Sequence, residues 1–202
     1  MNYSFKTISK KVMGDLHTPV SIYLKVRDIY PESALLESSD FHGNENSLSF
    51  IALRPLASIG INNGECTATF PDETREVTPL TEDYNVPEAM NAFLGRFKVE
   101  GADKKVCGLF GYTAFDAVRY FENIPVMEND APDMLYILYK YILVFNHFKN
   151  ELTLVEMLQE DEASRLEEIE TLIENRNFAS YNFQTAGPET SPITGEEYKA
   201  MV

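Results

Sequence analysis

The sequence predicts an α+β fold, and three observations support that prediction. Over most of the first two thirds of the 202 residues, short segments alternate apolar and polar side chains with the period of a β-strand. Residues 135–145 are uncharged apart from Lys140, which indicates a strand covered on both faces. Residues 161–176 instead repeat apolar side chains at the spacing of an amphipathic helix.

Strands are expected throughout the first 80 residues. The segment 19–26 alternates as a strand does, and Pro55 is expected to close the strand that precedes it. Asn62-Asn63-Gly64 separates two apolar runs, and its Asn-Gly step supplies the positive φ that a tight hairpin turn needs. The expected strands are therefore 19–26, 33–40, 47–53, 58–61, 65–70 and 75–80.

The apolar period lengthens to that of a helix after residue 85. Pro87 suits a first helical turn, where its missing N–H has no bond to make. The expected elements are a helix at 86–98, a strand at 104–112 and a helix at 113–122. Within the second helix, Asp116, Arg119 and Glu122 are spaced three residues apart, which favours a row of structural ion pairs.

The strongest strand signal covers 134–158, where two apolar strands flank the turn at 146–150. The tyrosines of the first strand are expected in the sheet core, and His147 is expected to cap the turn. The helix at 161–176 then buries a stripe of three side chains, namely Leu166, Ile169 and Ile173.

The end of the chain predicts a linker followed by a new helix. Residues 177–193 are polar and contain two prolines. Thr194 can then cap a helix while Glu197 reaches back to its backbone N–H, which forms a capping box. Since a linker and a fresh helix cap normally lead into another domain, we expect this sequence to be the front part of a longer protein.

Composition excludes several classes of partner. The 17 basic and 32 acidic residues give a net charge of −15, which disfavours nucleic acid and anionic membrane surfaces. No apolar run approaches the roughly 20 residues of a membrane span, and the first 15 residues lack the apolar stretch of a signal peptide. Cys66 and Cys107 are expected to be buried, reduced thiols. These features together favour a cytoplasmic protein.

Generic motifs name no chemistry. His17, His42 and His147 lie far apart in the sequence, so no zinc site is proposed. Phosphate-binding glycine loops and nucleophile-elbow motifs are absent from the sequence. The residues alone leave open a stand-alone ligand-binding β module, whereas a self-sufficient hydrolase is disfavoured because no Ser/His or Cys/His arrangement is recognisable.

Three stretches in order resemble one family, the large subunit (component I) of anthranilate synthase among the chorismate-utilising enzymes. They are "ALLESSDFHGNENSLSFIALRP" at 34–55, "GLFGYTAFDAVRYFENIP" at 108–125 and "APDMLYILYKYILVFNHFKNELTLV" at 131–155. The ending "SPITGEEYKAMV" resembles the start of the chorismate-binding domain. Enzymes that make aminodeoxychorismate or isochorismate share this architecture, and component I of aminodeoxychorismate synthase stays an alternative, but "FDAVRYFENIP" favours anthranilate synthase.

The resemblance implies a fold of layered antiparallel β-sheets with helices packed outside. It implies that 1–184 is the N-terminal domain, and that 185–202 is a linker and the start of a C-terminal chorismate-binding domain. The family's lyase reaction converts chorismate to anthranilate and pyruvate in tryptophan biosynthesis, with ammonia from a glutamine amidotransferase subunit in a hetero-oligomer. Its Mg²⁺ and catalytic residues belong to the second domain, so none is assigned here and the fragment alone is expected to be inactive.

The resemblance also implies that this part holds half of a tryptophan feedback site. The family's Leu-Leu-Glu-Ser segment corresponds to residues 35–38, which makes Ser38 the first candidate, with Leu36 and Glu37 beside it. Asn46 stands where some members have a basic residue, so it can donate a hydrogen bond but brings no charge. Phe115 and Asn146 are milder departures, from Tyr and Asp. Without the family, the residues favour a strand-end serine at Ser38 and a solvated or ion-paired carboxylate at Glu37.

Overall fold

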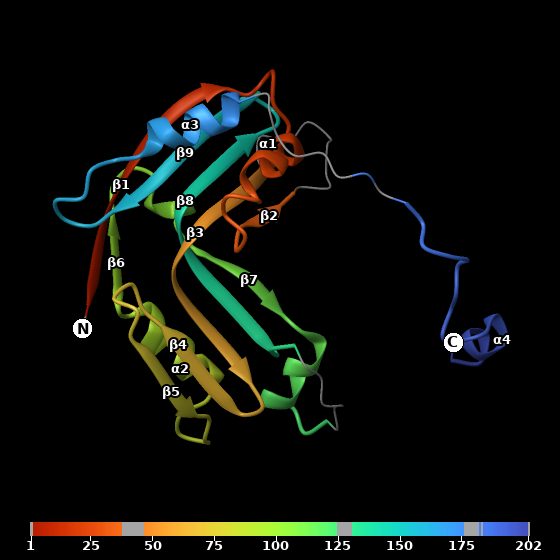
Figure 1. Cartoon of the computed structure of the whole chain (residues 1–202). Helices are drawn as coiled ribbons and strands as arrows, with labels where there is room; N and C mark the ends of the chain where they lie inside the picture. Colours follow the sequence, from red (N-terminus) through yellow and green to blue (C-terminus); the bar gives the residue numbers. More distant parts are fainter. Residues whose placement is uncertain (1, 38–46, 125–130, 176–181, 183, 202) are drawn as a thin grey trace.

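The computed structural model describes residues 2–37, 47–124, 131–175, 182 and 184–201. Its framework is one nine-stranded sheet (Figure 1). The strands are β1 (Tyr3–Met13), β2 (Ala34–Leu36), β3 (Leu48–Asn62), β4 (Glu65–Thr69), β5 (Arg75–Pro79), β6 (Phe97–Glu100), β7 (Leu109–Thr113), β8 (Met134–Asn146) and β9 (Glu151–Leu158). The helices are α1 (Pro19–Val26), α2 (Val86–Leu94), α3 (Leu166–Glu174) and α4 (Gly195–Met201), with 3₁₀ turns η1 (Lys104–Val106) and η2 (Phe115–Tyr120).

The long pair β3–β8 is the centre of the sheet. The strand order is β5-β4-β3-β8-β9-β1-β6, with β2 added to β3 and β7 added to β8. The strand pairings are antiparallel except that between β1 and β6, which is parallel. The α+β class is therefore confirmed, with the strands joined in a single mixed sheet.

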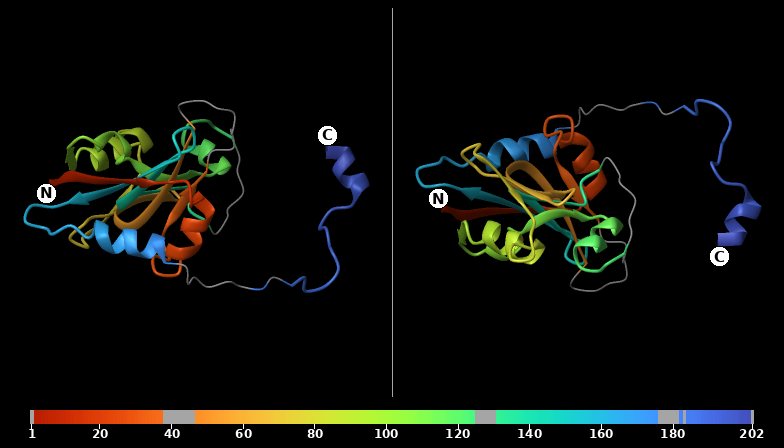
Figure 2. Two further views of the ribbon diagram at one scale, coloured as in Figure 1. Left: turned by 90° about the horizontal axis from the view of Figure 1, so that it is seen from above. Right: turned by 90° about the horizontal axis from the view of Figure 1, so that it is seen from below.

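Helices cover both faces of this sheet, as expected. Figure 2 shows α1 and α3 on one face and α2 on the other. On the first face, Ile22 and Val26 of α1 belong to the same hydrophobic core cluster as Ile169 and Ile173 of α3. The predicted stripe of Leu166, Ile169 and Ile173 is thus confirmed as buried.

The segment 19–26 is helical, so the prediction of a strand there was wrong. Thr18 and Ser21 form a capping box at its start, and Pro19 occupies the first turn. Ile22 and Val26, four residues apart, are fully buried, whereas Val20 is 43% exposed. The period that matters is therefore that of the helix, and the alternation of apolar residues was coincidental.

Strand β3 does not end at Pro55, as the sequence analysis expected, but continues to Asn62. The register against β8 shifts between Pro55 and Ala57, and Arg54 has a φ of 61°. A bulge accommodates proline because the ladder hydrogen bonds are already interrupted there. The hairpin after β3 is confirmed, with positive φ at both Asn63 and Gly64.

Three further boundaries differ from expectation. Helix α2 ends at Leu94 rather than at residue 98, and Phe97 begins β6. The expected strand at 104–112 divides into η1 and β7. The expected helix at 113–122 is the 3₁₀ turn η2.

The heavily apolar strand β8 is buried on both faces, as predicted. Tyr139 and Tyr141 lie in the core, where burial raises the pKa of each phenol to about 12. Lys140 between them is only 2% exposed. Of the two cysteines, Cys66 is buried and Cys107 is partly buried, and both are free thiols.

Helix α4 carries the predicted capping box. Thr194 N donates to Glu197 Oε2 at 2.7 Å, and Glu197 N donates to Thr194 Oγ1 at 3.3 Å. Figure 1 shows α4 at the end of an extended segment, away from the sheet. The apolar Tyr198 and Met201 are 61% and 65% exposed.

Candidate functional site

The structure describes two of the four predicted effector residues. Leu36 ends β2 and is 43% exposed, and Glu37 follows it with an exposed side chain. Ser38 and Asn46 lie outside the described residues. Strand β2 pairs with β3 through Ala34–Ala52, Leu35–Ile51 and Leu36–Phe50. The described half of the candidate site is thus the exposed end of a short strand held on one side by β3.

The start of β3 is fixed close to this strand end. Ser49 is fully buried, and its Oγ lies 2.7 Å from His147 Nε2 at the end of β8. The His147 N–H donates to Ser47 O at 3.1 Å. In the turn after β8, Asn146 Oδ1 accepts from Lys149 N at 3.0 Å, while a capping role for the His147 side chain stays a prediction.

Arg119 has an ion-pair partner that its spacing did not predict. Its guanidinium pairs with the fully buried Asp133, just before β8. Tyr120 Oη donates to the other carboxylate oxygen of Asp133 at 2.6 Å and accepts from Gly64 N at 3.1 Å. These contacts join η2, β8 and the β3–β4 hairpin, which makes them structural.

The environment of Asp133 favours its charged form. Burial raises the pKa of the carboxyl, but the hydrogen bonds from Tyr120 and Arg119, together with the Arg119 charge, outweigh that effect. The pKa of Asp133 is therefore below its ordinary 3.8. Burial and the bond to Asp133 both raise the pKa of Tyr120, so this pair stays carboxylate and phenol at neutral pH.

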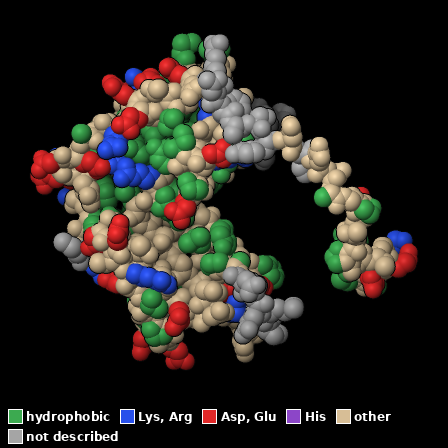
Figure 3. All heavy atoms as spheres, in the orientation of Figure 1, with side chains coloured by type: hydrophobic (Ala, Val, Ile, Leu, Met, Phe, Trp, Pro, Cys, Tyr) green, Lys and Arg blue, Asp and Glu red, His purple; other side chains and the backbone are tan. Residues whose placement is uncertain are grey.

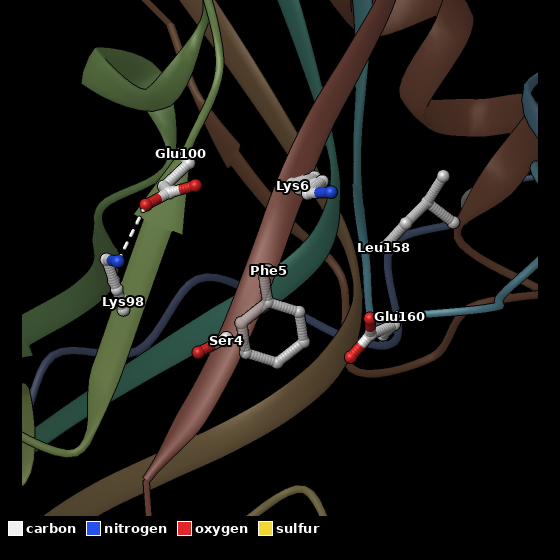
Figure 4. A pocket seen from close by; sticks show the side chains of 7 residues that line it. All are labelled: Ser4, Phe5, Lys6, Lys98, Glu100, Leu158 and Glu160. Atoms are coloured by element: carbon white, nitrogen blue, oxygen red, sulfur yellow. Dashed lines mark ion pairs between the residues drawn. The ribbon is translucent and has the colours of Figure 1, made fainter.

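Several surface cavities lie elsewhere among the described residues. One, drawn in Figure 4, has a volume of about 140 Å³ and is lined by Ser4, Phe5 and Lys6 of β1, Lys98 and Glu100 of β6, Leu158 and Glu160. Lys98 and Glu100 pair within it at 2.7 Å. Ligand pockets measure roughly 300–1,000 Å³, so this groove is too small for one.

A larger hollow, of about 550 Å³, lies at the β3 bulge, with Leu56, Leu135 and Ile137 in its wall and Glu32, Arg54 and Glu73 among its polar lining. Glu32 precedes β2, whereas Leu36 ends it and Glu37 follows it. Leu36 and Glu37 do not line this hollow. The two described candidates, Leu36 and Glu37, therefore lie at the opposite end of β2 from the hollow.

The described residues offer neither a cluster of metal ligands nor a helix that could span a membrane. They contain no group of three or more His, Cys, Asp or Glu side chains placed to hold a metal ion. Within the same residues, every helix is too short or too polar to cross a membrane.

Comparisons with known proteins give a consistent result. The family described as chorismate binding enzyme matches residues 32–202. Anthranilate synthase component 1 of Thermus thermophilus is 32% identical over 151 residues, which is 72% of this chain and 31% of that protein. The Lactococcus lactis protein of the same name is 28% identical over 155 residues, 73% of this chain and 31% of that protein. The chain thus spans about a third of the length of these relatives.

A solved structure, anthranilate synthase component I from Streptococcus pneumoniae, aligns with 81% of this chain and 35% of its own, at 20% identity and a TM-score of 0.41. The family match covers most of the sequence and includes β2, β3, β8 and β9. The chain therefore belongs to the chorismate-binding enzymes, and over most of its length it is related to anthranilate synthase component 1.

Proposed function

We propose that this chain is the N-terminal regulatory and scaffold part of an anthranilate synthase component I. The observation that carries the proposal is its 32% identity with the Thermus thermophilus protein over 151 residues. The complete enzyme converts chorismate to anthranilate and pyruvate, a lyase reaction, with ammonia from a glutamine amidotransferase subunit. Its Mg²⁺ is bound by residues of a second domain and not by this part.

An apolar surface at β7 and η2 supports the scaffold role. Four large apolar side chains in or near β7 and η2 are 42–90% exposed, namely Tyr112, Phe115, Phe121 and Ile124. Figure 3 shows apolar side chains gathered over this part of the molecule. Because relatives are about three times as long as the matched segment, we assign this surface to contact with the second domain.

The regulatory role is assigned to the end of β2. An exposed strand end offers backbone groups and the Glu37 carboxylate to the ammonium of an amino acid. In the proposal, Ser38 and Asn46 add neutral hydrogen bonds, and Leu36 contacts the indole ring. The effector is tryptophan, the end product of the pathway that anthranilate enters, and the second domain completes the site.

The test is to express the whole open reading frame that encodes this sequence and to assay anthranilate by its fluorescence. Chorismate with ammonia and Mg²⁺ is expected to yield anthranilate and pyruvate in equal amounts. Formation of aminodeoxychorismate or isochorismate instead would reassign the protein within its family. Absence of any chorismate consumption by a folded product would contradict the proposal.

A further inference from the structure

A cluster of three charged residues lies beneath the connection between β9 and α3. Lys140, in the middle of β8, is 2% exposed, and Glu156, on the adjacent strand β9, is fully buried. The Lys140 Nζ lies 3.7 Å from Glu156 Oε1 and pairs directly with Glu162 Oε1. We call these three residues the Lys140 cluster. Burying charges is costly unless they are paired, so the cluster needs a structural reason.

Glu156 uses its other oxygen to hold the start of α3. Its Oε2 accepts from Ser164 Oγ at 2.8 Å and from Arg165 N at 3.0 Å. Arg165 is the N-cap residue of α3, and its own side chain makes no capping hydrogen bond. A carboxylate on a neighbouring strand therefore caps this helix, and it also suits the positive end of the helix dipole.

Glu162 holds the connection itself. Besides pairing with Lys140, its carboxylate accepts from Gln159 N at 3.2 Å. Its side chain is 37% exposed and closes over the buried ammonium. Glu156 Oε1 has no hydrogen-bond partner among the described residues, so Lys140 is the group that compensates its charge.

Contacts lead from the Lys140 cluster to β2 by two routes. Along α3, Ile173 O accepts from Lys25 Nζ of α1 at 2.5 Å, and α1 leads into β2. Along β8, the Tyr141 ring next to Lys140 packs on Tyr30 with 6.4 Å between centroids. Ser33 N, just before β2, donates to Tyr30 O at 3.0 Å. Figure 1 shows α3, α1 and β2 gathered at one end of the sheet.

We propose that the Lys140 cluster positions β2, and thereby sets the affinity of the site at its end for the effector. The three residues act through α3, α1 and Tyr30 and touch no ligand, so they are positioning residues. The consequence for tryptophan rests on the proposed function, whereas the mechanical link between the cluster and β2 does not.

Amide hydrogen exchange of the 202-residue chain tests the mechanical link. Glu162→Gln keeps the size of the side chain and removes its charge. Amide exchange is expected to accelerate about tenfold in 159–168 and in 34–36, because the substitution removes a charge-assisted hydrogen bond that opposes local opening. The matched control is Glu170→Gln on the same helix, which removes the surface pair with Lys10 at 2.5 Å and is expected to change neither segment.

Faster exchange in 159–168 with unchanged exchange in 34–36 would overturn the proposal, and so would no change in either segment. Faster exchange in the distant strands β4 and β5 as well would show general destabilisation and would also overturn it. In the whole enzyme, Glu162→Gln is expected to raise the inhibitory concentration of tryptophan while kcat stays constant. A wild-type enzyme insensitive to tryptophan would remove the proposed function and leave the exchange result standing.

Discussion

The contact between Asp133 and Tyr120 gives a stability prediction that can be worked from the structure. Asp133→Asn keeps the shape of the side chain but turns one acceptor oxygen into a donor and removes the charge. One charge-assisted hydrogen bond is lost, and the other becomes a neutral hydrogen bond. A charge-assisted bond contributes about 1.5–3 kcal/mol and a neutral bond about 0.5–1.5 kcal/mol. The free energy of unfolding is therefore expected to fall by roughly 2–4 kcal/mol.

Urea unfolding followed by circular dichroism measures this change, since the chain contains no tryptophan. Asp83→Asn at an exposed position is the control and is expected to stay within about 0.5 kcal/mol of wild type. Tyr120→Phe and the double variant complete a thermodynamic cycle. The reasoning is refuted if Asp133→Asn and Tyr120→Phe prove additive within about 0.5 kcal/mol, because directly bonded groups should couple.

The pH dependence of the same variant has a defined sign. The folded pKa of Asp133 is depressed, so its ionised form stabilises the protein above the unfolded value of about 3.8. That contribution is lost as pH falls below 3.8 through the folded pKa. The stability difference between wild type and Asp133→Asn is therefore expected in full at neutral pH, and it should shrink as the pH falls below about 3.8.

Three other outcomes are expected. Gly111→Ala places a Cβ 1.9 Å from Leu135 O, so it should lower the free energy of unfolding in urea by about 3 kcal/mol or more. The control Gly108→Ala has open space around the new Cβ and should not destabilise the protein. Equal effects of the two substitutions would contradict the geometry. Phe115→Ser should reduce self-association at high concentration in sedimentation experiments, since Phe115 is 90% exposed; a wild type that stays monomeric would count against the apolar contact surface. The 202-residue chain alone should form no anthranilate from chorismate with ammonia or glutamine, and fluorescence above a no-protein blank would refute this.

Much of the fold could be predicted because local patterns and tertiary environment agree. The Asn63-Gly64 hairpin, the apolar strand β8 and the buried stripe of α3 follow directly from turn chemistry and apolar period. The prediction of a strand at 19–26 was wrong because these eight residues, which include two β-branched valines, fit both the period of a strand and that of a helix. Thr18 just before it and Pro19 at its first position were the signal of a helix start, and they decide the outcome.

The long-range charge contacts could not be predicted from spacing. Arg119 has acidic neighbours at helical distance in sequence, but its partner Asp133 arrives from the start of β8. Lys140 was visible only as an isolated charge in an apolar strand, and its partners come from β9 and the connection after it. For the candidate site, sequence resemblance suggested the residues, which stay a prediction, and the structure adds that Leu36 and Glu37 lie at an exposed strand end.

Tryptophan inhibition of the whole enzyme, compared between wild type and Ser38→Ala, tests the central claim most directly. Loss of one neutral hydrogen bond is expected to raise the inhibitory concentration by roughly threefold to tenfold, with kcat unchanged. Calorimetry on the 202-residue chain should show weak or no binding, because in the proposal the second domain completes the site. An inhibition curve that Ser38→Ala leaves unchanged, or micromolar binding by this chain alone, would contradict the assignment of half an effector site to the end of β2.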